Sequence, residues 1–226
     1  MLDVIHLHID PQPHDGAWNM AADQAWLELS PVPVLRVYPW DQPTVTLGYA
    51  QTHAKLAAAL PPGWPIIRRW TGGGVVLHQA DYTYSVIIPG IHPWAETRPL
   101  DSYRLIHAAL AATLDENGHS GCRLAEREDL IEDAFCFVAP ALHDVIRGKV
   151  KISGAGQRRG KTGLLHQGSI QQVTLENTFW PLFAKKLATS VHVQPDMPTP
   201  IRLRADELAE KRYRRPEWLT ERDDVL

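Results

Sequence analysis

The chain has 226 residues, of which 44% are hydrophobic and 22% charged, so it is long enough to bury a core as one domain. Its formal net charge of −3 lacks the basic excess of nucleic-acid-binding proteins, and no window approaches the roughly 20 apolar residues of a membrane span. Two cysteines are too few for a disulfide framework, and no basic segment precedes an apolar run at the N-terminus. We therefore expect a cytoplasmic protein with neither nucleic acid nor membrane as partner.

Strands and one clear helix alternate at the start of the chain. The apolar pattern predicts a strand at 4–9, a helix that begins after Asp15 and ends before Pro31, and strands at 34–38 and 44–47. His6 and His8 would share one face of the first strand, but no third ligand is evident, so we expect no metal site.

The middle of the chain continues this mixed α/β pattern. It predicts one or two helical turns at 54–60, strands at 66–69 and 82–88, and a helix at 102–117 that stops at Gly118. The strand at 82–88 alternates between two faces, with Tyr and Val on one and Thr and Ser on the other.

A run of three glycines stands out within the segment from Arg68 to Pro89, which reads RRWTGGGVVLHQADYTYSVIIP. Glycine lacks a Cβ atom, so the backbone can take positive φ and a ligand can approach its N–H groups closely. A simple β-turn or bulge explains a bare glycine triplet equally well, and both readings remain open at this point.

The second glycine-rich segment, GAGQRRGKTG at 154–163, is predicted to be a mobile loop facing an anionic or carbonyl-bearing ligand. Short strands are predicted at 144–146 and 149–152, and a longer one at 164–170. The spacing fits neither a dinucleotide-binding motif nor a phosphate-binding P-loop.

The last part of the chain predicts helices at 175–187 and 203–213. We find no repeat and no linker long enough to divide the chain, so residues 1–226 are predicted to form a single domain.

Six segments in this order resemble the biotin/lipoate protein ligase superfamily, on its branch of lipoate-protein ligase A and LipM-type octanoyltransferases. They are DGAWNMAADQAWL, PVLRVYPWDQPTVTLGYAQ, the glycine-triplet segment, CFVAP, KISGAGQRRGKTGLLHQGSI and RYRRPEWL. The resemblance implies an α/β (α+β) fold with a mixed, largely antiparallel sheet flanked by helices, like the catalytic domains of class II aminoacyl-tRNA synthetases and biotin–lipoate ligases. It also implies that residues 1–226 form one catalytic domain of this type, and we expect no C-terminal accessory domain.

The resemblance also implies which residues form the site. The lysine of the Lys-Ile-x-Gly motif, Lys151, would touch the acyl carbonyl as a catalytic residue, and the backbone amides of the glycine loop would help to hold a developing oxyanion. The implied substrate-binding residues are Arg69, Gly72, Gly73, Gly74, His78, Gly154, Gln157, His166 and Gly168.

Cys136 resembles the nucleophilic cysteine of LipM-type octanoyltransferases, where a thiolate would carry the acyl group as a thioester. The alternative is a plain core thiol, which is what a free cysteine between two phenylalanines usually is. Cys122 has no such context and is read as structural. Two departures complicate the match: Ala141 stands where the LipM pattern has serine, and Gly74 stands where arginine is frequent and looks more ligase-like.

Three functions follow from these alternatives. The first is octanoyl (or lipoyl) transfer from acyl carrier protein through Cys136 to a lipoyl domain, either of a 2-oxo acid dehydrogenase E2 component or of the glycine cleavage H protein, and it needs no cofactor. The second is a lipoate-protein ligase that uses ATP and Mg²⁺ and passes through lipoyl-AMP. The third is a non-catalytic module that binds acyl groups.

Overall fold

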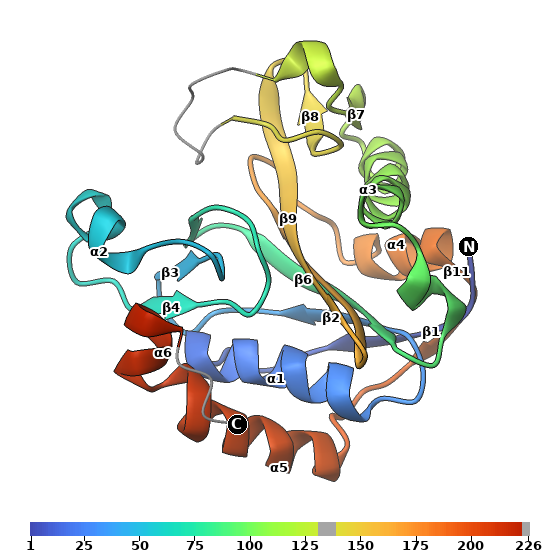
Figure 1. Ribbon diagram of the computed structural model, residues 1–226. Helices are drawn as coiled ribbons and strands as arrows, with labels where there is room; N and C mark the ends of the chain where they lie inside the picture. The colour runs from blue at the N-terminus through green and yellow to red at the C-terminus, as the bar shows by residue number, and fades with distance from the viewer. Residues whose placement is uncertain (131–138, 223–226) are drawn as a thin grey trace.

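A mixed eight-stranded sheet forms the centre of the computed structural model, which describes residues 1–130 and 139–222 (Figure 1). Its strands stand in the order β11-β1-β2-β6-β10-β9-β8-β7. They are β1 (Leu2–Ile9), β2 (Val34–Tyr38), β6 (Tyr82–Pro89), β7 (Cys122–Leu124), β8 (Val145–Arg147), β9 (Val150–Gly160), β10 (Gly163–Ile170) and β11 (Ala188–Val193). Strand β1 pairs parallel with β11 and β2, and the other neighbours pair antiparallel, which confirms the predicted sheet.

A smaller sheet carries the glycine triplet. It consists of β3 (Thr44–Leu47), β4 (Ile66–Arg68) and β5 (Val76–His78) in the order β4-β3-β5. The triplet lies between β4 and β5, so both ends of the loop are anchored to the same central strand, β3.

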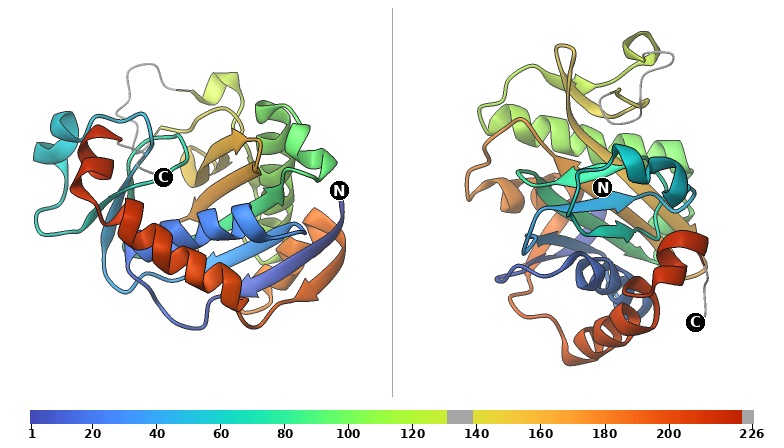
Figure 2. Two further views of the ribbon diagram at one scale, coloured as in Figure 1. Left: turned by 60° about the horizontal axis from the view of Figure 1, so that its bottom comes forward. Right: turned by 90° about the vertical axis from the view of Figure 1, so that its left-hand side faces the viewer.

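Helices cover both faces of the large sheet, as Figure 2 shows from two sides. Helices α3 and α4 pack on one face, and α1 and α5 lie side by side on the other. The helices are α1 (Gly16–Leu29), α2 (His53–Leu56), α3 (Pro99–Glu116), α4 (Phe179–Leu187), α5 (Thr199–Leu208) and α6 (Pro216–Glu221). No helix within the described ranges is long and apolar enough to cross a bilayer.

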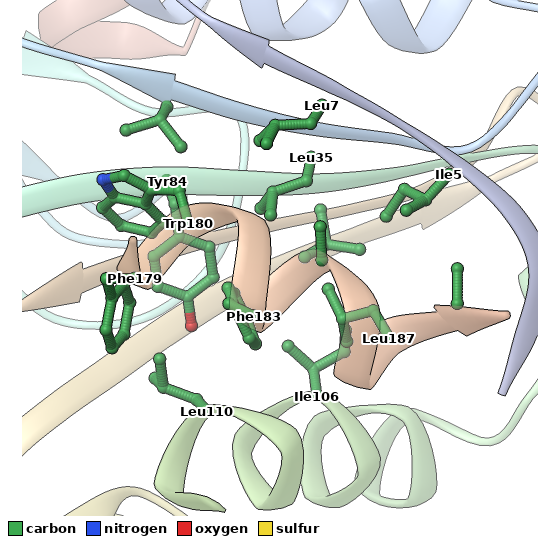
Figure 3. Packing of buried hydrophobic residues seen from close by; sticks show 14 of the residues in the cluster. Ile5, Leu7, Leu35, Tyr84, Ile106, Leu110, Phe179, Trp180, Phe183 and Leu187 are labelled. Atoms are coloured by element: carbon green, nitrogen blue, oxygen red, sulfur yellow. The ribbon is translucent and has the colours of Figure 1, made fainter. Parts of the chain in front are cut away.

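Strand β6 shows how alternation builds two cores. Tyr84, Val86 and Ile88 point into the cluster under α3 and α4, part of which Figure 3 shows, while Ile87 packs on the side of α1. The predicted start of α1 is also confirmed, because the Asp15 carboxylate accepts a hydrogen bond from the backbone N–H of Trp18.

The predicted mobile loop at 154–163 is wrong. Residues up to Gly160 belong to β9, whose residues 153–160 pair with β10, and only a tight turn connects the two strands. Glycine is unfavourable within strands and therefore suggested a loop, but here it makes room for chain segments that pack against the strand. Strand β11 and the short strands β5 and β7 were not predicted, and α4 begins at Phe179 rather than at 175.

Candidate active site

A cavity of about 460 Å³ lies between the glycine loop and the strands β9 and β10. Its wall includes Lys151 from β9, Gln167 from β10 and residues of the loop. The volume falls within the range of pockets that bind small molecules. Of the predicted site residues, those that border it are Arg69, Gly73, Gly74, His78, Lys151, Gly154 and Gly168.

Arg69 holds the glycine loop in shape. Its Nη2 atom donates to the carbonyl oxygens of Gly72 at 3.1 Å and Gly74 at 2.9 Å, and its Nη1 atom donates to Thr46 Oγ1 at 2.6 Å. Gly73 has a φ of 92°, a left-handed conformation that favours glycine. Burial lowers the pKa of Arg69 to about 10, so the guanidinium remains charged at neutral pH.

The glycine loop rests directly on β9. The backbone N–H of Gly72 donates to the carbonyl of Gln157 at 3.2 Å, and a Cβ atom added to Gly156 would lie 2.4 Å from the Gly72 carbonyl oxygen. This close approach explains why β9 carries glycine at position 156. The triplet is therefore a structured loop at the cavity wall rather than a free turn.

Lys151 reaches the cavity because β9 contains a bulge. Val145 pairs with Ser153 while Ile146 pairs with Lys151, so one step along β8 spans two steps along β9. The bulge brings the lysine over Gly154, where an added Cβ atom would lie 2.6 Å from Lys151 Cε. The spacing of the Lys-Ile-x-Gly motif thus places the lysine beside a residue without a side chain, and the end of the lysine occupies the space that a Cβ atom would take.

Two polar groups hold the Lys151 ammonium. Nζ lies 2.7 Å from Oδ2 of the buried Asp144 and donates to the carbonyl of Ala139 at 3.5 Å. The lysine side chain keeps 27% of its surface exposed, whereas that of Asp144 keeps 1%. A partly open ammonium at a cavity wall can stabilise negative charge that develops on a carbonyl oxygen.

His78 belongs to a polar cluster in the part of the cavity wall that the small sheet forms. Thr46 Oγ1 accepts from Arg69, so the hydroxyl proton of Thr46 can be donated to His78 Nε2 at 2.9 Å. The other ring nitrogen of His78, Nδ1, then carries a hydrogen and donates it to Asp81 at 2.8 Å. Burial alone would raise the pKa of Asp81, but His78 and two hydroxyl groups hold it below its usual value. Trp40 stacks on the imidazole at 4.0 Å, so the ring is fixed.

Gln157 and His166 are placed differently from the prediction. Their side chains contact each other on the face of the sheet covered by α3, with Gln157 Nε2 3.0 Å from His166 Nδ1. His166 is fully buried beside Tyr103, and desolvation lowers its pKa well below the usual value. Neither side chain faces the cavity. Gly168 borders the cavity with its backbone, while its other side makes room for the hydroxyl of Tyr84.

Gln167 was missed at the sequence level, although it lies at the cavity wall. Its Oε1 accepts from the Thr71 hydroxyl at 2.6 Å, and its Nε2 donates to Asp23 at 2.7 Å. Asp23 in turn pairs with the buried Arg36. The strict alternation of β10 could have identified Gln167, because it must face away from the side that carries His166.

The predicted nucleophile Cys136 lies outside the described residues. The described chain resumes at Ala139, three residues further along the sequence, whose carbonyl accepts from Lys151. Within residues 1–130 and 139–222, no group of three or more His, Cys, Asp or Glu side chains could hold a metal ion.

Comparison with known proteins supports a single family. Residues 15–202 match the family model of the lipoyl protein ligase A/B catalytic domain. The chain belongs to this family. It is 34% identical over 188 residues to the octanoyltransferase LipM of Carboxydothermus hydrogenoformans, which covers 79% of this chain and 70% of that protein. It is 37% identical over 173 residues to the LipM of Moorella thermoacetica, covering 72% of this chain and 63% of that protein.

Solved structures show that the family fold is shared. A lipoate-protein ligase A bound with ATP superposes with a TM-score of 0.74 at 20% identity, covering 97% of this chain and 99% of that one. The bi-partite lipoate protein ligase of Thermoplasma acidophilum gives a TM-score of 0.72 at 19% identity and covers all of both chains. The fold class, the superfamily and its octanoyltransferase branch, to which the similar LipM proteins belong, are therefore confirmed.

Proposed function

We propose that this member of the family transfers an octanoyl group from acyl carrier protein, through a thioester on Cys136, to a lysine of a lipoyl domain. The observation that carries the proposal is the position of Lys151, which stands at the wall of a cavity of about 460 Å³ that the glycine loop also lines. The similarity to octanoyltransferases named LipM supports the octanoyl group as cargo. A related ligase whose structure was analysed together with its E2 lipoyl domain supports a lipoyl domain as acceptor.

The first half-reaction would load the enzyme. The Cys136 thiolate attacks the carbonyl carbon of the octanoyl thioester, and the carbonyl oxygen gains negative charge that Lys151 and nearby backbone N–H groups stabilise. When the intermediate collapses, the bond between the carbonyl carbon and the carrier sulfur breaks. The carrier thiolate leaves and takes up a proton, and the octanoyl group remains on Cys136.

The second half-reaction would transfer the group. The neutral ε-amine of the acceptor lysine attacks the carbonyl carbon of the acyl-enzyme, a C–N bond forms and the bond to the Cys136 sulfur breaks. The amine nitrogen gives up a proton, and the thiolate is regenerated. The sum is one thioester converted to one amide, so this route needs no ATP, metal ion or other cofactor.

A test without ATP separates this route from the two alternatives. The purified protein is mixed with octanoyl-carrier protein and an apo lipoyl domain, and the intact mass of the lipoyl domain is followed with time. We expect the mass to rise by one octanoyl group. Modification only with free lipoate or octanoate, ATP and Mg²⁺ would instead identify an ATP-dependent ligase, and no modification with either donor would identify a non-catalytic binding module.

A further inference from the structure

A buried carboxylate behind Lys151 joins three separate parts of the chain. Asp144 Oδ2 lies 2.7 Å from Lys151 Nζ and also accepts from the backbone N–H of Ala141 at 2.7 Å. Its other oxygen, Oδ1, accepts from the hydroxyl of Tyr103 at 2.5 Å. The carboxylate therefore has hydrogen-bond donors from β9, from helix α3 and from the segment that resumes at Ala139.

Tyr103 fixes the carboxylate relative to the strand that carries the lysine. Its hydroxyl oxygen accepts from the backbone N–H of Ala155 at 2.9 Å while its proton goes to Asp144. Burial and the charge of Asp144 raise the pKa of Tyr103 well above its usual value, so the hydroxyl remains a donor. One residue before Asp144, the carbonyl of His143 accepts from the buried His107 at 2.7 Å.

The two partners of the ion pair differ in exposure: Asp144 is buried, whereas Lys151 is partly exposed. Burial of a carboxylate is costly and rarely the best way to gain stability, even when a cation pairs with it. Here the cation remains partly exposed at the cavity wall, and its long side chain passes through the space left by Gly154. Without a fixed partner, a lysine with four rotatable bonds would lose this position readily.

We propose that Asp144 is a positioning residue that fixes the Lys151 ammonium at the place of the acyl carbonyl oxygen, with Tyr103 as its support. This inference rests on the proposed function, in which Lys151 stabilises the oxyanion. Asp144 does not border the cavity and acts only through the lysine. The reacting carbonyl would meet an ammonium that is already oriented, so no reorganisation is required in the transition state.

The primary variant is Asp144→Asn. It keeps the size of the side chain and an acceptor for Tyr103, but removes the charge that pairs with Lys151. We expect kcat for octanoyl transfer to fall about 10- to 100-fold, the ratio for one lost charge-assisted hydrogen bond, with KM for the octanoyl donor little changed. The matched control is Asp101→Asn, at a residue on the same helix as Tyr103. It breaks an exposed ion pair with Arg98 and should leave kcat at the wild-type value.

A second readout does not depend on the reaction. An amine-reactive ester labels Lys151 at mildly alkaline pH, and peptide mass spectrometry measures its rate. Because the ion pair shields the amine, we expect faster labelling in Asp144→Asn than in the wild type. If the wild type fails to transfer without ATP, the proposed function fails, and this labelling rate still decides whether Asp144 positions the lysine.

Gly154→Ala tests the same idea without removing the charge of the carboxylate. Its Cβ atom would meet the flexible end of Lys151, 2.6 Å from Cε and 2.8 Å from Nζ, and would lie 3.1 Å from Asp144 Oδ1, so the lysine rather than the backbone must move. We expect a loss in kcat similar to that of Asp144→Asn with little change in melting temperature. Should Asp144→Asn not fold, this variant decides the question. Wild-type kcat in either folded variant, or an unchanged labelling rate in Asp144→Asn, would overturn the inference.

Discussion

The contact between β9 and the glycine loop leads to a sharp prediction for Gly156→Ala. The added Cβ atom would lie 2.4 Å from the carbonyl oxygen and 3.1 Å from the carbonyl carbon of Gly72. Both are backbone atoms, so no side-chain rotation relieves the overlap. An ordinary carbon–oxygen contact is roughly 3.3 Å or longer, and the loop must therefore retreat from β9 by about 1 Å.

The retreat has two calculable consequences. It strains or breaks the 3.2 Å hydrogen bond from Gly72 to the Gln157 carbonyl, and it overpacks a close contact. Together these effects should lower the free energy of unfolding by about 1–3 kcal/mol, or the melting temperature by about 2 to 12 °C. Since the loop forms one wall of the cavity, a shift of about 1 Å should also lower kcat/KM for transfer by up to about 100-fold.

Gly160→Ala is the matched control in the same strand. An added Cβ atom there meets nothing within 4 Å in the described part of the chain, and the backbone is not left-handed. We expect wild-type melting temperature and kinetics. Both variants would be compared by thermal unfolding and by the ATP-free transfer assay. If Gly156→Ala matched Gly160→Ala in both measurements, the loop would not be held against β9 as described.

Two further predictions concern the stability of the fold. Trp218 is fully buried, and its indole N–H donates to the Arg68 carbonyl at 3.0 Å, so Trp218→Ala should cost about 3–5 kcal/mol in urea unfolding; a cost below about 1 kcal/mol would contradict this packing. Burial alone would raise the pKa of Asp10, but Arg36 and His8 lower it below its unfolded value. The resulting stabilisation is complete above about pH 4 and is lost as the pH falls through the pKa of Asp10 in the folded state. When the pH is lowered through this range, the free energy of unfolding should therefore decrease less in Asp10→Asn than in the wild type. An equal decrease in both proteins would refute this role.

Alternation and capping made much of the fold predictable. The alternation of Tyr82 to Ser85 predicted the strand at 82–88, and the carboxylate of Asp15 in front of an apolar helical pattern marked the start of α1. Strand β11 was not predicted. It begins at Ala188, directly after the last residue of α4, and no glycine or proline marks the change from helix to strand.

The candidate site was predictable only in part, because its geometry depends on tertiary contacts. Strand alternation puts His166 and Gly168 on the same side of β10, but it does not say which side faces the cavity. The bulge at Ile152, which turns Lys151 over Gly154, depends on pairing with β8. The contact of Asp144 with Lys151 crosses a hairpin, and a carboxylate seven residues before the motif lysine is the only sequence signal for it.

The most direct test of the thioester route is to trap the acyl-enzyme. The protein is incubated with octanoyl-carrier protein, without acceptor and without ATP, and the intact mass and the modified peptide are determined for the wild type, Cys136→Ala and Cys122→Ala. We predict one octanoyl adduct on Cys136 in the wild type and in Cys122→Ala, and neither adduct nor transfer in Cys136→Ala. Undiminished transfer to the lipoyl domain by Cys136→Ala would contradict the proposed route.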